Sequence, residues 1–143
     1  MDEQQTVKTF TVEEANRLLP QISGGIERTS FLFDRLRSLT KDIEDLHYIW
    51  GKDITDSANM DNSYYLEKIG LRERAVKEIN SIVADITSLG CVVKDAENGL
   101  VDFYSDNKGE LVFLCWRYGE KTITQWHAID GGFQTRQHID KLK

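Results

Sequence analysis

The sequence contains little of what marks several large classes of protein. Its 143 residues include one proline and only two cysteines, Cys91 and Cys115. Two cysteines are too few for the disulfide scaffold of a small secreted domain, so we expect free thiols in a reducing compartment. No apolar run approaches the ~20 residues of a membrane helix, and the first residues lack the basic and apolar regions of a secretory signal. We therefore expect a cytoplasmic protein that does not associate with membranes.

The chain also lacks an excess of basic residues. It has 18 lysines and arginines against 24 aspartates and glutamates, which gives a net charge of −6 and a pI near 5.1. This charge disfavours general nucleic-acid binding. The motifs of P-loop, dinucleotide-binding, zinc-protease and serine-hydrolase proteins do not occur. The sequence therefore leaves the cofactors unknown and enzymatic activity undecided.

What is present fits one globular unit. Hydrophobic residues make up 40% of the chain and charged residues 29%, which is normal for a protein with a packed core. We expect residues 1–143 to form a single domain in three parts. These parts are a helical hairpin over 10–90, an antiparallel sheet over 91–130 and a tail over 131–143.

The helical part begins with a recognisable start signal. Thr11 and Glu14 have the spacing of a capping box, in which each side chain bonds the other residue's backbone N–H. Pro20 disfavours a helical Leu19 and cannot donate a backbone hydrogen bond. The sequence therefore predicts a first short helix to about Leu19, followed by a kink or by a new helix with Pro20 in its first turn.

Two longer apolar periodicities follow. Apolar residues recur every three or four positions over 22–50 and again over 66–89, as on one face of a helix. The polar stretch 51–62 joins the two segments, and Gly90 is suited to end the second. The pattern predicts a long, antiparallel, coiled-coil-like hairpin, kinked near Pro20.

Beyond Gly90 the apolar period changes to two, which is typical of strands. The expected strands cover 91–94, 100–104, 110–118 and 122–129. The Asp-Asn-Lys-Gly sequence at 106–109 predicts a hairpin turn, with Gly109 at positive φ. The fold class is therefore α+β, with a helical hairpin followed by a small antiparallel meander of three to four strands.

Several motifs in combination are similar to one known family. They are Phe-Thr-Val-Glu-Glu-Ala-Asn-Arg-Leu-Leu-Pro at 10–20, Leu-Gly-Cys-Val-Val-Lys-Asp at 89–95, Gly-Leu-Val-Asp-Phe at 99–103, Leu-Cys-Trp-Arg at 114–117, Gly-Glu at 119–120, Trp-His at 126–127 and Asp-Gly-Gly-Phe at 130–133. With these motifs the chain resembles the bacterial and plastid family catalogued as domain of unknown function 2203, and it departs mainly in the loop after Trp50. The resemblance implies a fold and a compartment, and it implies no activity.

The candidate functional residues lie on the predicted strands and in the tail. If the strand register allows, Asp102, Cys115, Arg117 and His127 converge on one face, whereas a slip of one residue would separate them. We expect a connected site with further residues at its rim. The ligand-binding candidates are Asp102, Arg117, Glu120 and His127 in the site, with Asp130 and Arg136 at the rim.

Several kinds of chemistry fit these residues. Asp102, Cys115 and His127 are of the types that ligate zinc or a related divalent ion, although no pair has zinc-finger spacing. A Cys–His nucleophile is an alternative that requires the thiol and the imidazole within hydrogen-bonding reach. In a purely structural interpretation, Cys115 is a core thiol, Asp102 pairs with Arg117 to fix the register, and His127 is a satisfied structural histidine. Arg117 is also suited to hold an anionic ligand.

The leading functional hypothesis is a non-enzymatic interaction or scaffold module. Phe31, Phe33 and Leu36 exceed what one helix–helix seam needs, so we expect a homodimer, unless the sheet alone covers them. The hairpin is also a candidate surface for a different protein partner. The alternative hypotheses are a small-molecule or divalent-metal-binding protein that uses the polar residues of the sheet, and an enzyme.

Overall fold

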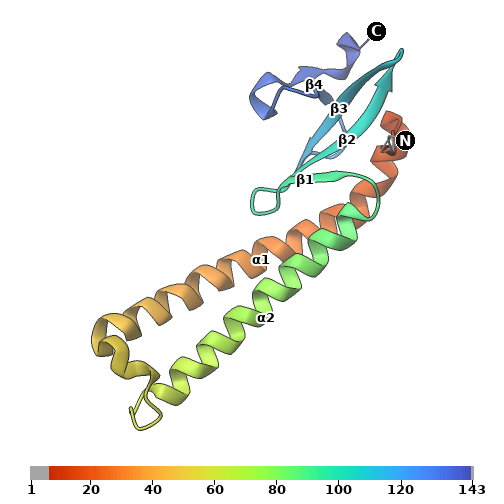
Figure 1. Cartoon of the computed structure of the whole chain (residues 1–143). Coiled ribbons are helices and arrows are strands. Elements are labelled where there is room, and N and C mark those ends of the chain that lie inside the picture. Colours follow the sequence, from red (N-terminus) through yellow and green to blue (C-terminus); the bar gives the residue numbers. More distant parts are fainter. Residues whose placement is uncertain (1–6, 143) are drawn as a thin grey trace, which may run out of the picture.

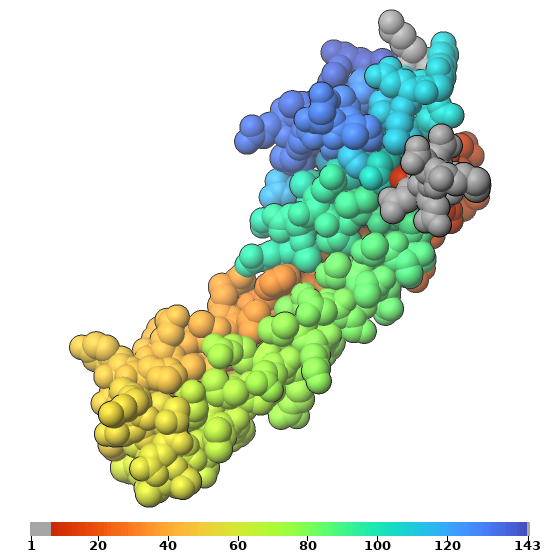
Figure 2. Space-filling view, viewed as in Figure 1, coloured from red at the N-terminus to blue at the C-terminus, as the bar shows by residue number. Residues whose placement is uncertain are grey.

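The computed structural model describes residues 7–142, and residues 1–6 and 143 lie outside the described part. Two long helices, α1 (Val12–Trp50) and α2 (Asn62–Thr87), pack as an antiparallel hairpin (Figure 1). An antiparallel sheet with the strand order β1-β2-β3-β4-β5 lies across the end of the hairpin where α1 begins and α2 finishes. The molecule is elongated, with the interhelical loop at the far end from the sheet (Figure 2). The α+β fold with a helical hairpin is confirmed.

The first helix begins where the sequence predicts. The Thr11 hydroxyl accepts the backbone N–H of Glu14 at 3.1 Å, and the Glu14 carboxylate accepts the backbone N–H of Thr11 at 2.9 Å. The alternative of two separate helices is wrong, because α1 is continuous through Pro20. Proline removes a single backbone hydrogen bond, and burial of Leu19 and Ile22 on either side of it holds the helix in place. Among the described residues, no helix is long and apolar enough to cross a membrane.

The hydrophobic core lies between the hairpin and one face of the sheet. Its buried members are Phe10, Ala15, Leu19, Ile22, Ile26, Ile86, Cys91, Val101, Phe103, Leu114, Trp116 and Ile123. A smaller cluster of Leu32, Ala75 and Ile79 continues between the helices. The predicted apolar face of α2 is partly wrong, since Leu66 and Val76 are exposed. Ile79 and Ile86 of the predicted face are buried, and Ala75 is buried beside them because this side of α2 packs on α1.

The sheet has one strand more than predicted. The strands are β1 (Val92–Asp95), β2 (Leu100–Asn107), β3 (Glu110–Arg117), β4 (Gln125–Ala128) and β5 (Gln137–His138). Short 3-10 turns cover Gly51–Thr55, Phe133–Thr135 and Ile139–Lys141. β5 consists of two polar residues without an alternating pattern, so it gives no signal in the sequence and lies within the predicted tail.

The turn between β2 and β3 forms as predicted. Lys108 and Gly109 both take positive φ, 54° and 88°, as a two-residue hairpin loop with the twist of its strands requires. The Asp106 carboxylate accepts the backbone N–H of Gly109 at 2.7 Å. This turn fixes the register of β2 against β3.

A close approach at Gly99 provides a test of the packing between the sheet and α1. Gly99 has φ +72°, and a Cβ atom there would lie 2.5 Å from Cβ of Tyr118 and 2.8 Å from Cγ2 of Ile26. We expect Gly99→Ala to lower the free energy of unfolding by about 3–4 kcal/mol, from backbone strain and overpacking together. The control Gly109→Ala has similar backbone strain and no atom within 4 Å of its Cβ, so about 1–2 kcal/mol is expected. Urea unfolding measures both, and equal losses would contradict this packing.

Candidate functional site

The sheet face turned away from the helices carries a buried polar cluster. Asp102 of β2 pairs with Cys115 of β3, and Phe113 of β3 pairs with His127 of β4. Residues paired across antiparallel strands share a face, and neighbours along a strand alternate. These side chains therefore lie opposite to core residues such as Phe103, which pack on the helices.

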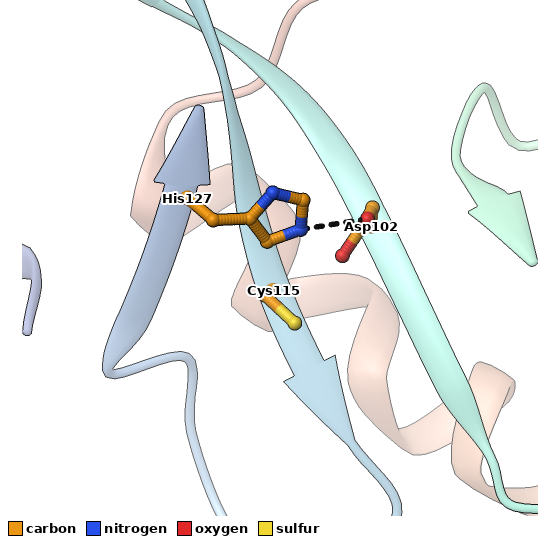
Figure 3. A group of neighbouring side chains, drawn as sticks. All are labelled: Asp102, Cys115 and His127. Carbon is orange, nitrogen blue, oxygen red and sulfur yellow. Dashed lines mark hydrogen bonds and ion pairs between the residues drawn. The ribbon is translucent and has the colours of Figure 1, made fainter. Parts of the chain in front are cut away.

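His127 reaches across β3 to Asp102. Its Nε2 lies 2.9 Å from Oδ2 of Asp102, and Figure 3 shows the imidazole extending over the strand that carries Cys115. Since β3 lies between β2 and β4, the contact joins two strands that are not neighbours in the sheet. The small side chain of Cys115 leaves room for the ring. All three residues are buried, with exposed fractions of 1% for Asp102, 0% for Cys115 and 2% for His127.

The hydrogen bonds of His127 restrict its protonation. Its Nδ1 lies 2.8 Å from the backbone carbonyl oxygen of Ala128. A carbonyl oxygen only accepts, so Nδ1 carries a proton. Nε2 then either donates to the Asp102 carboxylate or accepts from its protonated form. In both arrangements the His127–Asp102 pair has no net charge, as burial favours.

The chemistry of Cys115 follows from its position. Burial and the nearby Asp102 carboxylate raise the pKa of the Cys115 thiol to about 12. A thiol that stays protonated and lies out of contact with solvent is a poor nucleophile. These properties argue against the Cys–His nucleophile.

One atom of the cluster has unsatisfied bonding capacity. Oδ1 of Asp102 is buried and has no hydrogen-bond partner among the described residues. One ligating atom each from Asp102, Cys115 and His127 lie within 4.8 Å of one another. A buried carboxylate oxygen without a partner costs about 1–3 kcal/mol or more, so a positively charged ligand at this point would remove a real penalty.

Glu120 and Arg136 form a second cluster near the end of β3. Nη2 of Arg136 lies 2.8 and 2.7 Å from the two carboxylate oxygens of Glu120. The same carboxylate accepts the backbone N–H of Arg117, and the Glu120 carbonyl accepts Nε1 of Trp116. This pair therefore ties the C-terminal segment to the β3–β4 connection. It adjoins the first cluster, because Nη2 of Arg136 also lies 3.5 Å from the carbonyl oxygen of Cys115.

The structure corrects two parts of the predicted site. The expected ion pair between Asp102 and Arg117 is not formed, because Asp102 lies opposite Cys115 and is bonded by His127, whereas Arg117 lies opposite Leu100. Of the four residues predicted to form one site, His127 bonds Asp102 and Glu120 bonds Arg136, and the contact from Arg136 to the Cys115 carbonyl joins the two pairs. The exposed guanidinium of Arg117 instead lies 5.4 Å from the ring centroid of Phe133.

Asp130, the other rim candidate, is exposed and makes no ion pair within residues 7–142. Two further groups contribute to these clusters. The Ala128 carbonyl orients His127, and a backbone group leaves no signal in a sequence. The Phe133 ring lies under both Arg117 and Arg136, at 5.4 and 4.7 Å from the guanidinium carbons. An aromatic residue close to Arg136 in the sequence was the only available sign of this stacking.

The two thiols give a direct test of the site's burial. Burial also raises the pKa of Cys91, to about 11, so both thiols are protonated at neutral pH. We expect neither to react with an aromatic disulfide reagent in the folded protein, and both to react in denaturant. A Cys115→Ser variant assigns any reactive thiol. Rapid modification of Cys115 in the native state would contradict its placement.

Comparison with known proteins gives a family for the chain. Residues 8–139 match the family described as uncharacterized conserved protein, DUF2203. No curated protein and no solved structure shows a significant match to the chain. Since the match covers most of the chain, including both long helices and all of the sheet through β5, this protein belongs to the DUF2203 family.

Proposed function

We propose that this protein binds one divalent ion of the zinc class at Asp102, Cys115 and His127. The observation that carries the proposal is the buried convergence of three suitable ligand atoms within 4.8 Å, one of them beside the unpartnered Oδ1 of Asp102. Tetrahedral zinc separates its nitrogen, oxygen and sulfur ligands by about 3.3–3.6 Å. Small side-chain movements are enough to reach those separations.

The orientation of His127 supports this proposal. Ligating histidines usually donate their second ring N–H to a carbonyl or carboxylate, which fixes the ring and its tautomer. The bond from Nδ1 to the Ala128 carbonyl has this arrangement and leaves Nε2 directed toward Asp102 and Cys115. The imidazole is thus held in the direction that an ion requires.

The charges also balance. One carboxylate, one thiolate and a neutral imidazole carry a charge of −2, which a divalent ion cancels. Without the ion, the neutral His127–Asp102 pair and the protonated Cys115 thiol also sum to zero. Ion binding therefore exchanges M²⁺ for two protons and leaves the buried site neutral, which avoids the cost of an unbalanced buried charge.

We propose that the ion has a structural role. It would join β2, β3 and β4 on the face of the sheet that the helices do not cover. These three residues supply three of the four ligands of tetrahedral zinc, and the fourth would be the second carboxylate oxygen of Asp102 or a water. The burial of all three residues leaves no surface through which a substrate could take that position. With its free thiols, Cys91 and Cys115, such a protein fits a reducing cytoplasm.

Metal titration of the chelator-treated protein tests the proposal. We expect one Zn²⁺ or Co²⁺ per chain, two protons released per ion, and thiolate-to-cobalt charge-transfer absorption. At free Zn²⁺ about 100 times Kd, stability should rise by about 2.7 kcal/mol, or roughly 10 °C in melting temperature. Cys115→Ser should remove the absorption. Cys91→Ser, which changes the buried thiol outside the cluster, should keep it.

The same measurements have an outcome that contradicts the proposal. Asp102→Asn and His127→Gln remove ligands and also remove the bond between β2 and β4. If both variants lower stability by a few kcal/mol equally with and without Zn²⁺, and the wild type shows no metal-dependent stabilisation, the cluster is a hydrogen-bonded clamp alone.

A different observation favours a second function, as an interaction module. Large apolar side chains are exposed at the end of the hairpin far from the sheet, with exposed fractions of 92% for Tyr48, 66% for Ile49 and 82% for Met60. Exposed apolar surface of this kind marks binding sites. We propose that the hairpin projects as a binding arm in a homodimer.

The three residues that led us to expect a homodimer differ in how far they are buried. Phe33 and Leu36 are half-buried against the small cluster between the helices, so they need no second copy to cover them. Phe31 remains 56% exposed. Of the three, Phe31 is the one that supports an interface.

A further inference from the structure

Exposed apolar residues form a strip along one side of the hairpin. We define this side strip by three exposed residues, Phe31, Ile49 and Tyr64, together with the half-buried Leu71. Phe31 and Leu71 line a common groove of about 240 Å³ between the helices. Ile49 follows Phe31 by 18 residues, about five helical turns, so both lie on the same side of α1. Phe31, Ile49 and Tyr64 are 56%, 66% and 46% exposed.

An ion pair between the helices shows that Tyr64 of α2 lies on the same side of the hairpin. Asp42 follows Phe31 by 11 residues, about three turns, and so lies between Phe31 and Ile49 on the strip side of α1. Nζ of Lys68 lies 3.3 Å from Oδ2 of Asp42, and it lies 4.9 Å from the ring centroid of Tyr64. Tyr64 is therefore on the strip side of α2.

The two ends of the side strip differ in charge. The groove beside Phe31 is lined by three arginines and one glutamate, namely Arg28, Arg35, Arg74 and Glu78. The loop beside Ile49 and Tyr64 carries one lysine and three aspartates within residues 52–61. One end is thus basic and the other acidic, and about 27 Å of helix separates Phe31 from Ile49.

The opposite charges at the two ends of the side strip favour a second copy of the chain in the antiparallel orientation. A second copy laid antiparallel brings each basic end against an acidic end, whereas a parallel copy brings like charges together. A two-fold axis near Asp42 and Lys68 makes both contacts at once, as an isologous interface requires. We infer that a second copy of this chain docks antiparallel on the side strip, with Phe31 against Ile49 of the partner subunit. The inference rests on the interaction role proposed for the hairpin and is independent of the metal site.

Solution mass and designed crosslinks test the inference on the full chain. At tens of micromolar, light scattering should give twice the chain mass of 16.5 kDa. Phe31→Lys and Ile49→Lys should each give the single-chain mass. Val76→Lys is the matched control, because Val76 is an exposed apolar residue of α2 that lines a different groove, with Leu36 and Thr40. It should keep the doubled mass.

Cysteine substitution determines the direction of the two chains. The native thiols are buried, so Phe31→Cys and Ile49→Cys introduce the accessible ones. Under mild oxidation, an equimolar mixture of the two variants should form a crosslinked dimer, and each variant alone should not. Crosslinking of either variant with itself would overturn the antiparallel arrangement and retain a dimer. A single-chain mass for the wild type at all concentrations would overturn docking of a second copy. In that case Zn²⁺ titration of the same sample still decides the metal proposal.

Discussion

Above β3, the imidazole of His127 spans from β4 to the carboxylate of Asp102 on β2. Two strand spacings, about 9.5 Å, separate the strands that this contact joins. The helices cover the other face of the sheet, and on the outer face the rings of Tyr104 and His127 pack on either side of the buried Phe113. The cluster of Asp102, Cys115 and His127 holds the strands together on this face. It can do so because neighbouring groups orient the side chains. The Ala128 carbonyl sets the ring of His127, and the small Cys115 leaves room for it.

The same constraint supports the proposed ion site. A buried polar cluster is stable when all of its atoms have partners and its charges cancel. The His127–Asp102 pair meets the charge condition, but Oδ1 of Asp102 is left without a partner. Thiolate, imidazole and carboxylate around a divalent ion meet both conditions. The C-terminal segment also contacts the end of β3, through the ion pair of Arg136 with Glu120 and the hydrogen bond of Arg136 to the Cys115 carbonyl.

The features predicted correctly from the sequence are those encoded by nearby residues. The Thr11–Glu14 capping box and the turn at Lys108 and Gly109 depend on residues two or three positions apart. The features that were missed depend on contacts between distant parts of the chain. Packing against the sheet carries α1 through Pro20, and contact with α1 sets which side of α2 is buried. Polar β5 is formed by pairing with β4.

For the site, residue type was informative and geometry was not. Asp102, Cys115 and His127 were recognisable as possible ligands, but alternation along the strands also placed Arg117 on their face. In the observed register Arg117 lies opposite Leu100, and Asp102 lies opposite Cys115. Asp102 is therefore bonded by His127 and not by Arg117. Strand register depends on turns and on the buried face together, so it is read from a structure.

Anomalous diffraction from crystals grown with Zn²⁺, recorded on either side of the zinc absorption edge, tests the central claim most directly. We predict a single strong anomalous peak bounded by Sγ of Cys115, Nε2 of His127 and a carboxylate oxygen of Asp102. The zinc–sulfur distance should be near 2.3 Å and the others about 2.0–2.2 Å. An unbroken hydrogen bond between His127 and Asp102 with no anomalous peak beside it, in crystals that hold zinc elsewhere, would contradict the claim.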